Sequence, residues 1–160
     1  MALNLKVNGR SEWVEMDPSR PLLEVLREGL GLLGARRGCE TSYCGACSVL
    51  LDGQVVHACT VLAGMADGRE VTTIEGISSG EALHPVQSAF IQAGAIQCGY
   101  CTPGMVLAAI SLLQHEPNPT EEQIRQWIRG NLCRCTGYQK VVAAIAEAAA
   151  ALGRGGGNHA

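Results

Sequence analysis

The sequence predicts an α+β protein, with a first half that mixes strands and one helix and a second half that is helical. Three observations lead to this prediction. In the first half, short β-branched runs alternate with Asn-Gly and Asp-Gly turn signals. In the second half, apolar residues recur at helical spacing in four segments. The eight cysteines divide into four per half, with none between Cys59 and Cys98.

The first half contains five expected strands and one expected helix. The strands cover residues 3–7, 12–15, 48–51, 54–56 and 71–74, with turn dipeptides at 8–9, 52–53 and 67–68. A helix is expected between Pro21, which suits a first helical turn, and Gly29, which suits a helix end. Apolar residues at 22, 23, 25, 26 and 30 give this helix one buried face.

The second half begins after a Gly- and Ser-containing linker at 76–80 and contains four expected helices. These cover about 85–93, 103–115, 120–129 and 138–152, with Gly153 as the last cap. Thr120 and Gln123 form a capping-box signature at the third of them. A four-helix bundle is the economical assembly. The predicted units are therefore 1–77, 78–153 and a flexible tail at 154–160.

Charge and hydropathy exclude several classes of function. A net charge of −3 provides no basic surface for nucleic acid. The N-terminus shows no export signal, and the weakly polar stretch 141–153 is shorter than the roughly 20 residues of a membrane span. We therefore expect a cytoplasmic protein without a membrane span. Because disulfides are rare in the cytosol, the cysteines are expected to bind metal or to do redox chemistry.

The first cysteine quartet has the spacing of a plant-type 2Fe-2S site. Its members are Cys39, Cys44, Cys47 and Cys59, of which the first three follow the pattern C-x4-C-x2-C. Flanking glycines let the backbone approach an anionic cluster, so that amide N–H groups point at sulfur. The alternatives are a structural zinc site, which more often uses two short cysteine knuckles, and free thiols.

The second quartet is ambiguous from its spacing alone. Cys98 and Cys101 lie at a helix start, and Cys133 and Cys135 lie in the loop before the last helix. A 2Fe-2S cluster, a zinc ion and a dithiol redox pair all remain open.

Three blocks of sequence carry a resemblance to a known family. They read GCETSYCGAC at 38–47, QCGYCTPGM at 97–105 and GNLCRCTGY at 130–138. Together they resemble the small iron–sulfur subunit of the xanthine oxidase family of molybdenum hydroxylases, over nearly the whole chain. The resemblance implies a β-grasp ferredoxin-like domain followed by a helical-bundle domain. It also implies that both quartets bind 2Fe-2S clusters.

The resemblance further implies partner subunits that carry the other cofactors. A large subunit would hold a molybdenum–pterin cofactor beside the helical domain, and a medium subunit would hold FAD. Gln97 and Cys135 match the positions that approach the pterin, although Gln97 alternatively satisfies carbonyls of its own loop. No residue of this chain is expected to act on substrate. Relatives act on carbon monoxide, aldehydes, purines or N-heteroaromatic rings, so the substrate is not specified here.

One position departs from the common family pattern. Many relatives carry glycine where this chain has Ser42, and a serine there occurs in a subset that includes the aerobic carbon monoxide dehydrogenase type. A bulkier residue with a hydroxyl near sulfur is expected to alter the backbone hydrogen bonds and hence the reduction potential.

Three arginines lie in or beside the cysteine loops, and the chain has four histidines. Arg36 and Arg37 are expected to be solvated rather than to steady an anionic cluster, whereas Arg134, between two cysteines, is expected to do the latter or to dock a partner. The histidines lack mutual ligand spacing and are expected at the surface or in turns; they are His57, His84, His115 and His159.

The favoured function is therefore electron transfer within a heteromeric molybdenum hydroxylase. The alternative is a freestanding two-cluster ferredoxin-type carrier. A third hypothesis is a zinc-stabilised interaction module.

Overall fold

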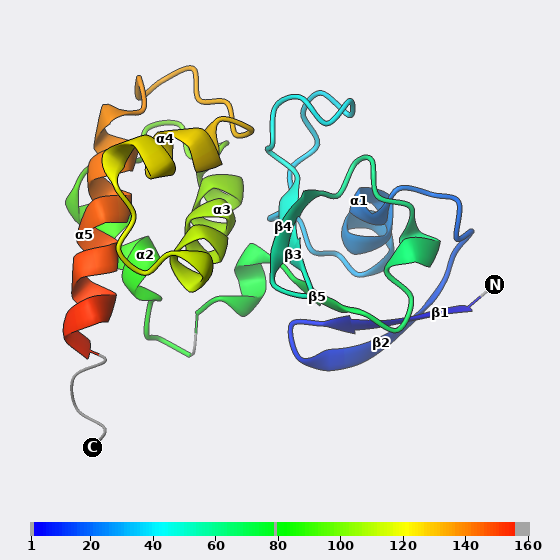
Figure 1. Cartoon of the computed structure of the whole chain (residues 1–160). Helices are drawn as coiled ribbons and strands as arrows, with labels where there is room; N and C mark the ends of the chain where they lie inside the picture. The colour runs from blue at the N-terminus through cyan, green and yellow to red at the C-terminus, as the bar shows by residue number, and fades with distance from the viewer. Residues whose placement is uncertain (1, 79, 156–160) are drawn as a thin grey trace.

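The computed structural model, which describes residues 2–78 and 80–155, contains two units that lie side by side (Figure 1). One unit is built on a mixed five-stranded sheet and the other on four α-helices. The predicted α+β fold class is confirmed.

The sheet has the order β2-β1-β5-β3-β4. β1 and β5 are parallel, and the other neighbouring pairs are antiparallel. All five predicted strands are present, as β1 (Ala2–Val7), β2 (Arg10–Glu15), β3 (Ser48–Leu51), β4 (Gln54–His57) and β5 (Glu70–Thr72). The last strand ends two residues early because the Thr73 N–H bonds the Asn8 side chain at 2.9 Å instead of a neighbouring strand.

The predicted helix of the first half forms in two parts. Helix α1 (Leu22–Glu24) continues as a π-helical turn, η1 (Val25–Gly29). The wider turn is closed by the Leu30 N–H, which bonds the Val25 carbonyl at 3.0 Å. The helix buries its predicted apolar face in the core of the first unit, where it packs with the inner faces of β1, β3 and β5.

The second unit contains the four predicted helices. They are α2 (Pro85–Gln92), α3 (Thr102–His115), α4 (Glu121–Ile128) and α5 (Gln139–Gly155). Helices α2 and α4 each pack against α3 and α5. The capping box at Thr120 is confirmed, since its hydroxyl accepts the Gln123 N–H at 3.3 Å.

The prediction that the last helix ends at Gly153 is wrong. Helix α5 continues to Gly155 and thus extends into the predicted tail, of which residues 156–160 lie outside the described part. An interior glycine costs a helix only about 1 kcal/mol, which the preceding run of alanines tolerates.

The central strand β3 joins the two units. Val49 and Leu51 belong to the core of the first unit, whereas Leu50 belongs to the core of the helical unit. Because side chains alternate along a strand, β3 presents one face to each core. Helix α3 packs directly on this strand, which fixes the second unit against the first. In the described part of the chain, no helix combines the length and apolar character needed to cross a membrane.

Candidate metal centres

The first quartet comes from one loop and one turn. Cys39, Cys44 and Cys47 lie on the loop before β3, and Cys59 follows β4. Because β3 and β4 are paired in register, with Ser48 opposite His57, the two strands bring Cys47 beside Cys59. Both of these thiols are buried.

Backbone N–H groups surround the sulfurs of this loop. Cys39 Sγ accepts from three of them, at 3.4 Å from Thr41 and at 3.3 Å from Tyr43 and Cys44. Cys44 Sγ accepts the Cys39 N–H, and Cys59 Sγ accepts the Ser42 N–H, both at 3.4 Å. Such donors stabilise thiolates and the anionic cluster that thiolates bind.

The thiols of this loop differ in acidity when no metal is bound. The Thr41 side chain, followed by backbone N–H groups, lowers the pKa of Cys39 to about 6. Burial raises the pKa of Cys47 to about 12. Cys39 is therefore mostly a thiolate at neutral pH, whereas Cys47 loses its proton only when it binds a metal.

The second quartet is assembled from two separate loops. Cys98 and Cys101 precede α3, and Cys133 and Cys135 precede α5. Cys98 and Cys135 are in contact, with their sulfurs 3.6 Å apart. The other two thiols pair likewise, as Cys101 with Cys133. Thr136 donates its N–H and its hydroxyl to Cys133 Sγ, at 3.3 and 3.0 Å.

Each of these pairs combines an acidic and a weakly acidic thiol. The Tyr100 N–H lowers the pKa of Cys98, and the hydrogen bond to Cys98 raises the pKa of Cys135. Burial raises the pKa of Cys101 to about 12. Burial opposes ionisation of Cys133 too, but the hydrogen bonds from Thr136 lower its pKa. Metal binding by four thiolates would release the remaining protons.

The donor sets fit a two-iron cluster. Among residues 2–78 and 80–155, no three His, Cys, Asp or Glu side chains are grouped to hold one metal ion. The thiols instead associate in twos, as Cys47 with Cys59 in the first quartet and as both pairs of the second. The N–H groups around Cys39 Sγ and the C-x4-C-x2-C spacing fit a 2Fe-2S cluster better than a zinc ion, which more often uses two short cysteine knuckles.

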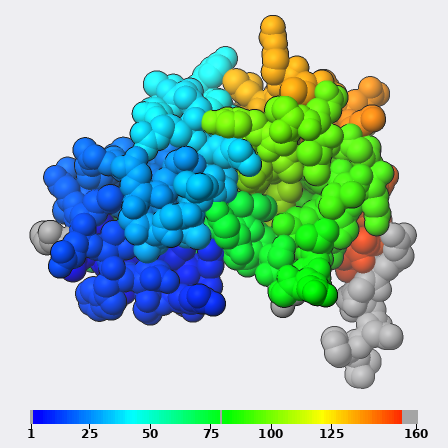
Figure 2. All heavy atoms as spheres, turned by 180° about the vertical axis from the view of Figure 1, so that it is seen from behind, coloured from blue at the N-terminus to red at the C-terminus, as the bar shows by residue number. Residues whose placement is uncertain are grey.

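The loops of the two quartets touch each other, as Figure 2 shows where the cyan and orange segments meet. The Leu132 N–H donates to the Cys44 carbonyl at 2.8 Å. The side chain of Asn131, which is only 3% exposed, donates to the Gly45 carbonyl and is 3.0 Å from Ser48 Oγ. A side chain at Gly45 would collide with the Gly130 carbonyl. Glycine is therefore required at this contact.

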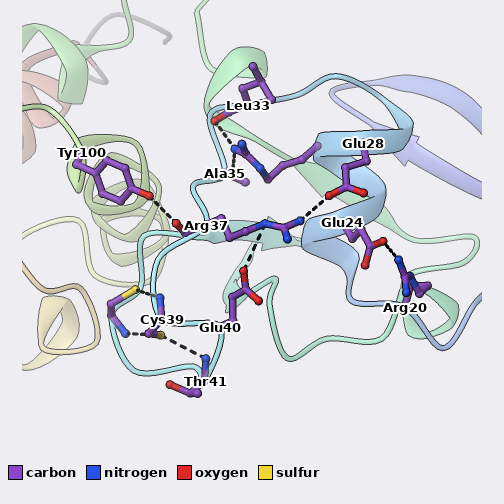
Figure 3. A network of polar contacts seen from close by, with 12 residues as sticks. Arg20, Glu24, Glu28, Leu33, Ala35, Arg37, Cys39, Glu40, Thr41 and Tyr100 are labelled. Atoms are coloured by element: carbon purple, nitrogen blue, oxygen red, sulfur yellow. Dashed lines mark hydrogen bonds and ion pairs between the residues drawn. The ribbon is translucent and has the colours of Figure 1, made fainter.

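A second contact joins the loops through Tyr100. Its hydroxyl donates to the Arg37 carbonyl at 2.6 Å, and the Arg36 guanidinium lies 5.3 Å from the centre of its ring. The Arg37 side chain pairs with Glu28 and Glu40 (Figure 3). Arg37 is exposed and its side chain forms only surface ion pairs, as expected of a solvated arginine, whereas the half-buried Arg36 lies over Tyr100, so the expectation is wrong for Arg36 alone.

The exposed side of the second quartet carries Gln97 and Cys135, the two residues that the resemblance relates to the pterin. Gln97, Cys98 and Cys135 are all exposed, and Gln97 directly precedes Cys98, whose sulfur lies 3.6 Å from that of Cys135. Arg134 is exposed between its two neighbouring cysteines. An apolar groove of about 310 Å³ opens beside Gly99 and includes Ile96 in its lining.

The histidines have more definite places than the sequence predicted. His57 contacts Ser42 of the first loop, and His84 caps α2 by accepting the Val86 N–H. His115 bonds Gln54 and so bridges the two units. His159 lies outside the described residues. The sequence signal that went unused for His57 is its place at the end of a strand, two residues before Cys59.

Comparisons with known proteins agree with this division into two sites. Residues 5–73 match the family described as "2Fe-2S iron-sulfur cluster binding domain", and residues 73–146 match "[2Fe-2S] binding domain". The chain is 45% identical over 145 residues to the nicotinate dehydrogenase small FeS subunit of Eubacterium barkeri, covering 91% of this chain and 92% of that one.

Two solved structures share the fold over 97% of this chain. Quinoline 2-oxidoreductase from Pseudomonas putida 86 matches with a TM-score of 0.92 and 40% identity, over 97% of the matched chain. The aldehyde oxidoreductase from Desulfovibrio gigas matches with a TM-score of 0.92 and 43% identity, over 17% of its chain. The same two-unit arrangement therefore occurs as a separate chain and as a small part of a longer one.

Proposed function

This chain belongs to the small iron–sulfur subunits of the xanthine oxidase family of molybdenum hydroxylases, and on that premise we propose the route of its electrons. It relays them one at a time from the molybdenum–pterin cofactor of a large subunit toward an FAD-bearing subunit or another acceptor. Each bound 2Fe-2S cluster supplies a one-electron carrier whose potential the protein sets. Substrate chemistry takes place on the partner.

The ligands in this proposal are the eight cysteines. Cys39, Cys44, Cys47 and Cys59 hold the first cluster, and Cys98, Cys101, Cys133 and Cys135 hold the second. Units 1–77 and 78–153 each provide one site. The N–H groups around the first quartet and the thiol pairs of the second support this assignment.

The observation that carries the proposal is the hydrogen bond between Leu132 and Cys44. It connects one ligand residue of the first site with the residue before Cys133 of the second. A continuous path of covalent bonds and one hydrogen bond therefore joins the quartets.

We infer the direction of the route from the exposed residues. Gln97 and Cys135 lie on the open face of the second quartet, where we place the pterin of the large subunit. The Gln97 amide offers both a donor and an acceptor to the edge of such a ring. Tyr43, which is 72% exposed at the tip of the first loop, lies on the side that we assign to the acceptor. We place the complex in the cytoplasm.

Metal analysis tests the cofactor assignment. The purified chain should contain four irons, two for each matched 2Fe-2S domain, and no stoichiometric zinc. Reduction should give two distinguishable EPR signals. A colourless protein with zinc in place of iron would instead support the interaction-module hypothesis.

Co-purification tests the subunit assignment. A tagged chain that is expressed with its neighbouring genes should bring down a molybdenum-containing large subunit. Gln97→Ala should slow electron transfer or loosen that association. A chain that elutes alone with both clusters and reduces a soluble acceptor would support the freestanding carrier and contradict the proposal.

A further inference from the structure

Ser42 adopts a backbone conformation that serine rarely takes. Its φ of 60° lies in the left-handed region, which is disfavoured for residues with a Cβ. In this conformation its N–H points at Cys59 Sγ, 3.4 Å away. This is the hydrogen bond by which the tip of the loop reaches the cysteine that follows β4. Something besides intrinsic preference must therefore hold Ser42 in place.

The imidazole of His57 supplies that restraint. Its Nδ1 lies 3.0 Å from the Ser42 hydroxyl and 3.0 Å from the Ser42 carbonyl oxygen. Because a carbonyl only accepts, Nδ1 must carry the proton and donate it. The ring thus binds Ser42 through both its side chain and its backbone.

His57 is itself held on two sides. It ends β4 opposite Ser48, and its carbonyl accepts the Thr60 N–H at 3.1 Å. The far edge of the ring faces Gly130, where an added Cβ would lie 3.6 Å from Cε1 and Nε2. The imidazole therefore fills the space between the first loop and the loop that leads to Cys133.

We propose that His57 is a positioning residue that acts through Ser42 to set the reduction potential of the first cluster. The inference rests on the proposed function, because it requires a 2Fe-2S cluster on the first quartet. A hydrogen bond to a ligand sulfur stabilises the more negative, reduced cluster and so raises its potential. Loss of the His57 donor frees Ser42, weakens its N–H bond to Cys59 and lowers that potential.

The test compares His57→Phe with His57→Asn in the assembled complex. Phenylalanine keeps a ring but has no donor, whereas the Asn amide places an N–H near the position of Nδ1. Each cluster is titrated separately by its EPR signal. At the wild-type midpoint, we expect His57→Phe to lower the reduced-to-oxidised ratio of the first cluster about threefold, or about 28 mV at 59 mV per tenfold. The second cluster should not change, and His57→Asn should restore the wild-type value.

A matched control uses the other histidine that bridges the two units. His115→Phe removes the contact with Gln54, far from the first loop, and should leave both potentials unchanged. Loss of the first EPR signal in His57→Phe, with that signal retained in His57→Asn, also supports the proposal. Equal behaviour of the Phe and Asn variants, or an unchanged potential in His57→Phe, overturns it. If the wild-type complex lacks two EPR signals, the proposed function fails before any variant is compared.

Discussion

The two quartets differ in what holds their thiols in place. In the first, Cys39 accepts three N–H bonds from residues two to five positions further along the same loop. In the second, Cys98 and Cys135 come from loops on either side of α3 and α4 and rest against each other. The first site is therefore shaped mainly by the backbone of its loop, whereas the second depends also on the packing of the helices that carry its two loops.

This difference matches the surroundings of the two sites. Two thiols of the first quartet are buried, whereas two of the second are exposed on a face with Gln97. The first loop is held by contacts within this chain, including those of His57, and so keeps its geometry without help from a partner subunit. A site between two loops leaves an open face, and this suits the side toward the pterin. Substitutions in the loops and at the contact between them measure how far each site depends on its own loop and how far on that contact.

The largest loss of stability is expected from Gly45→Ala, which disrupts the contact between the two cysteine loops. The new Cβ would collide with the Gly130 carbonyl, and φ is +68°. Because backbone cannot move aside cheaply, we expect a loss of at least about 3 kcal/mol and poor iron retention. Urea unfolding followed by visible absorbance measures this.

Gly68→Ala is the matched control for that substitution. Its φ is +71°, but nothing lies within 4 Å of the added Cβ. It should cost only the backbone strain, about 1–2 kcal/mol. Equal losses in the two variants would show that strain alone, and not the contact between the loops, explains the effect.

The next largest effect is expected in the reactivity of Cys39 when the chain contains no iron. If its backbone shapes the site, Cys39 keeps its hydrogen bonds from Thr41 in the iron-free chain, and its pKa of about 6 persists. Because the thiolate is the nucleophile, its alkylation rate should rise through pH 6 and level off above about pH 7. Cys47 and Cys101, whose pKa is raised to about 12, should react slowly throughout this range.

Peptide mass spectrometry resolves the individual thiols in that experiment. The control is the same chain in denaturant, where the alkylation rate of every cysteine should have its pH midpoint at the ordinary pKa of about 8.5. A Cys39 midpoint near that value in the folded iron-free chain would mean that iron, and not the backbone, shapes the first loop.

The sequence predicted most of the fold because its signals are local. Turn dipeptides between β-branched runs marked all five strands, and Thr120 with Gln123 marked the start of α4. The π-helical turn at Val25–Gly29 carried no such signal, since its apolar spacing also suits an ordinary helix. The end of the last helix was missed because glycine is only a weak stop when helix-favouring residues precede it.

The site was predictable in its residue types but not in its contacts. Cysteine spacing and three sequence blocks identified both quartets. The hydrogen bond between Asn131 and Gly45 spans 86 positions, and that between Tyr100 and Arg37 spans 63. Such contacts depend on how the two units pack, which no local pattern encodes. His57 was dismissed for the same reason, because its partner Ser42 lies on a different segment.

A smaller effect is expected from Tyr100→Phe, which removes the second contact between the loops. The lost hydrogen bond to the Arg37 carbonyl should cost about 0.5–1.5 kcal/mol, because the group lies near solvent. Tyr43→Phe, on the exposed tip of the first loop, is the control and should change stability little. If both variants unfold at the same urea concentration as the wild type, the Tyr100 bond does not help to join the two loops.

The smallest effect is expected from Arg37→Met, which separates the two roles of one residue. The substitution removes ion pairs with Glu28 and Glu40 but keeps the carbonyl that Tyr100 binds. Since the paired side chains are about half exposed, we expect less than about 0.5 kcal/mol, and this difference should vanish in about 1 M salt. A loss larger than that of Tyr100→Phe would mean that the Arg37 side chain, and not its backbone, secures the first loop beside the second.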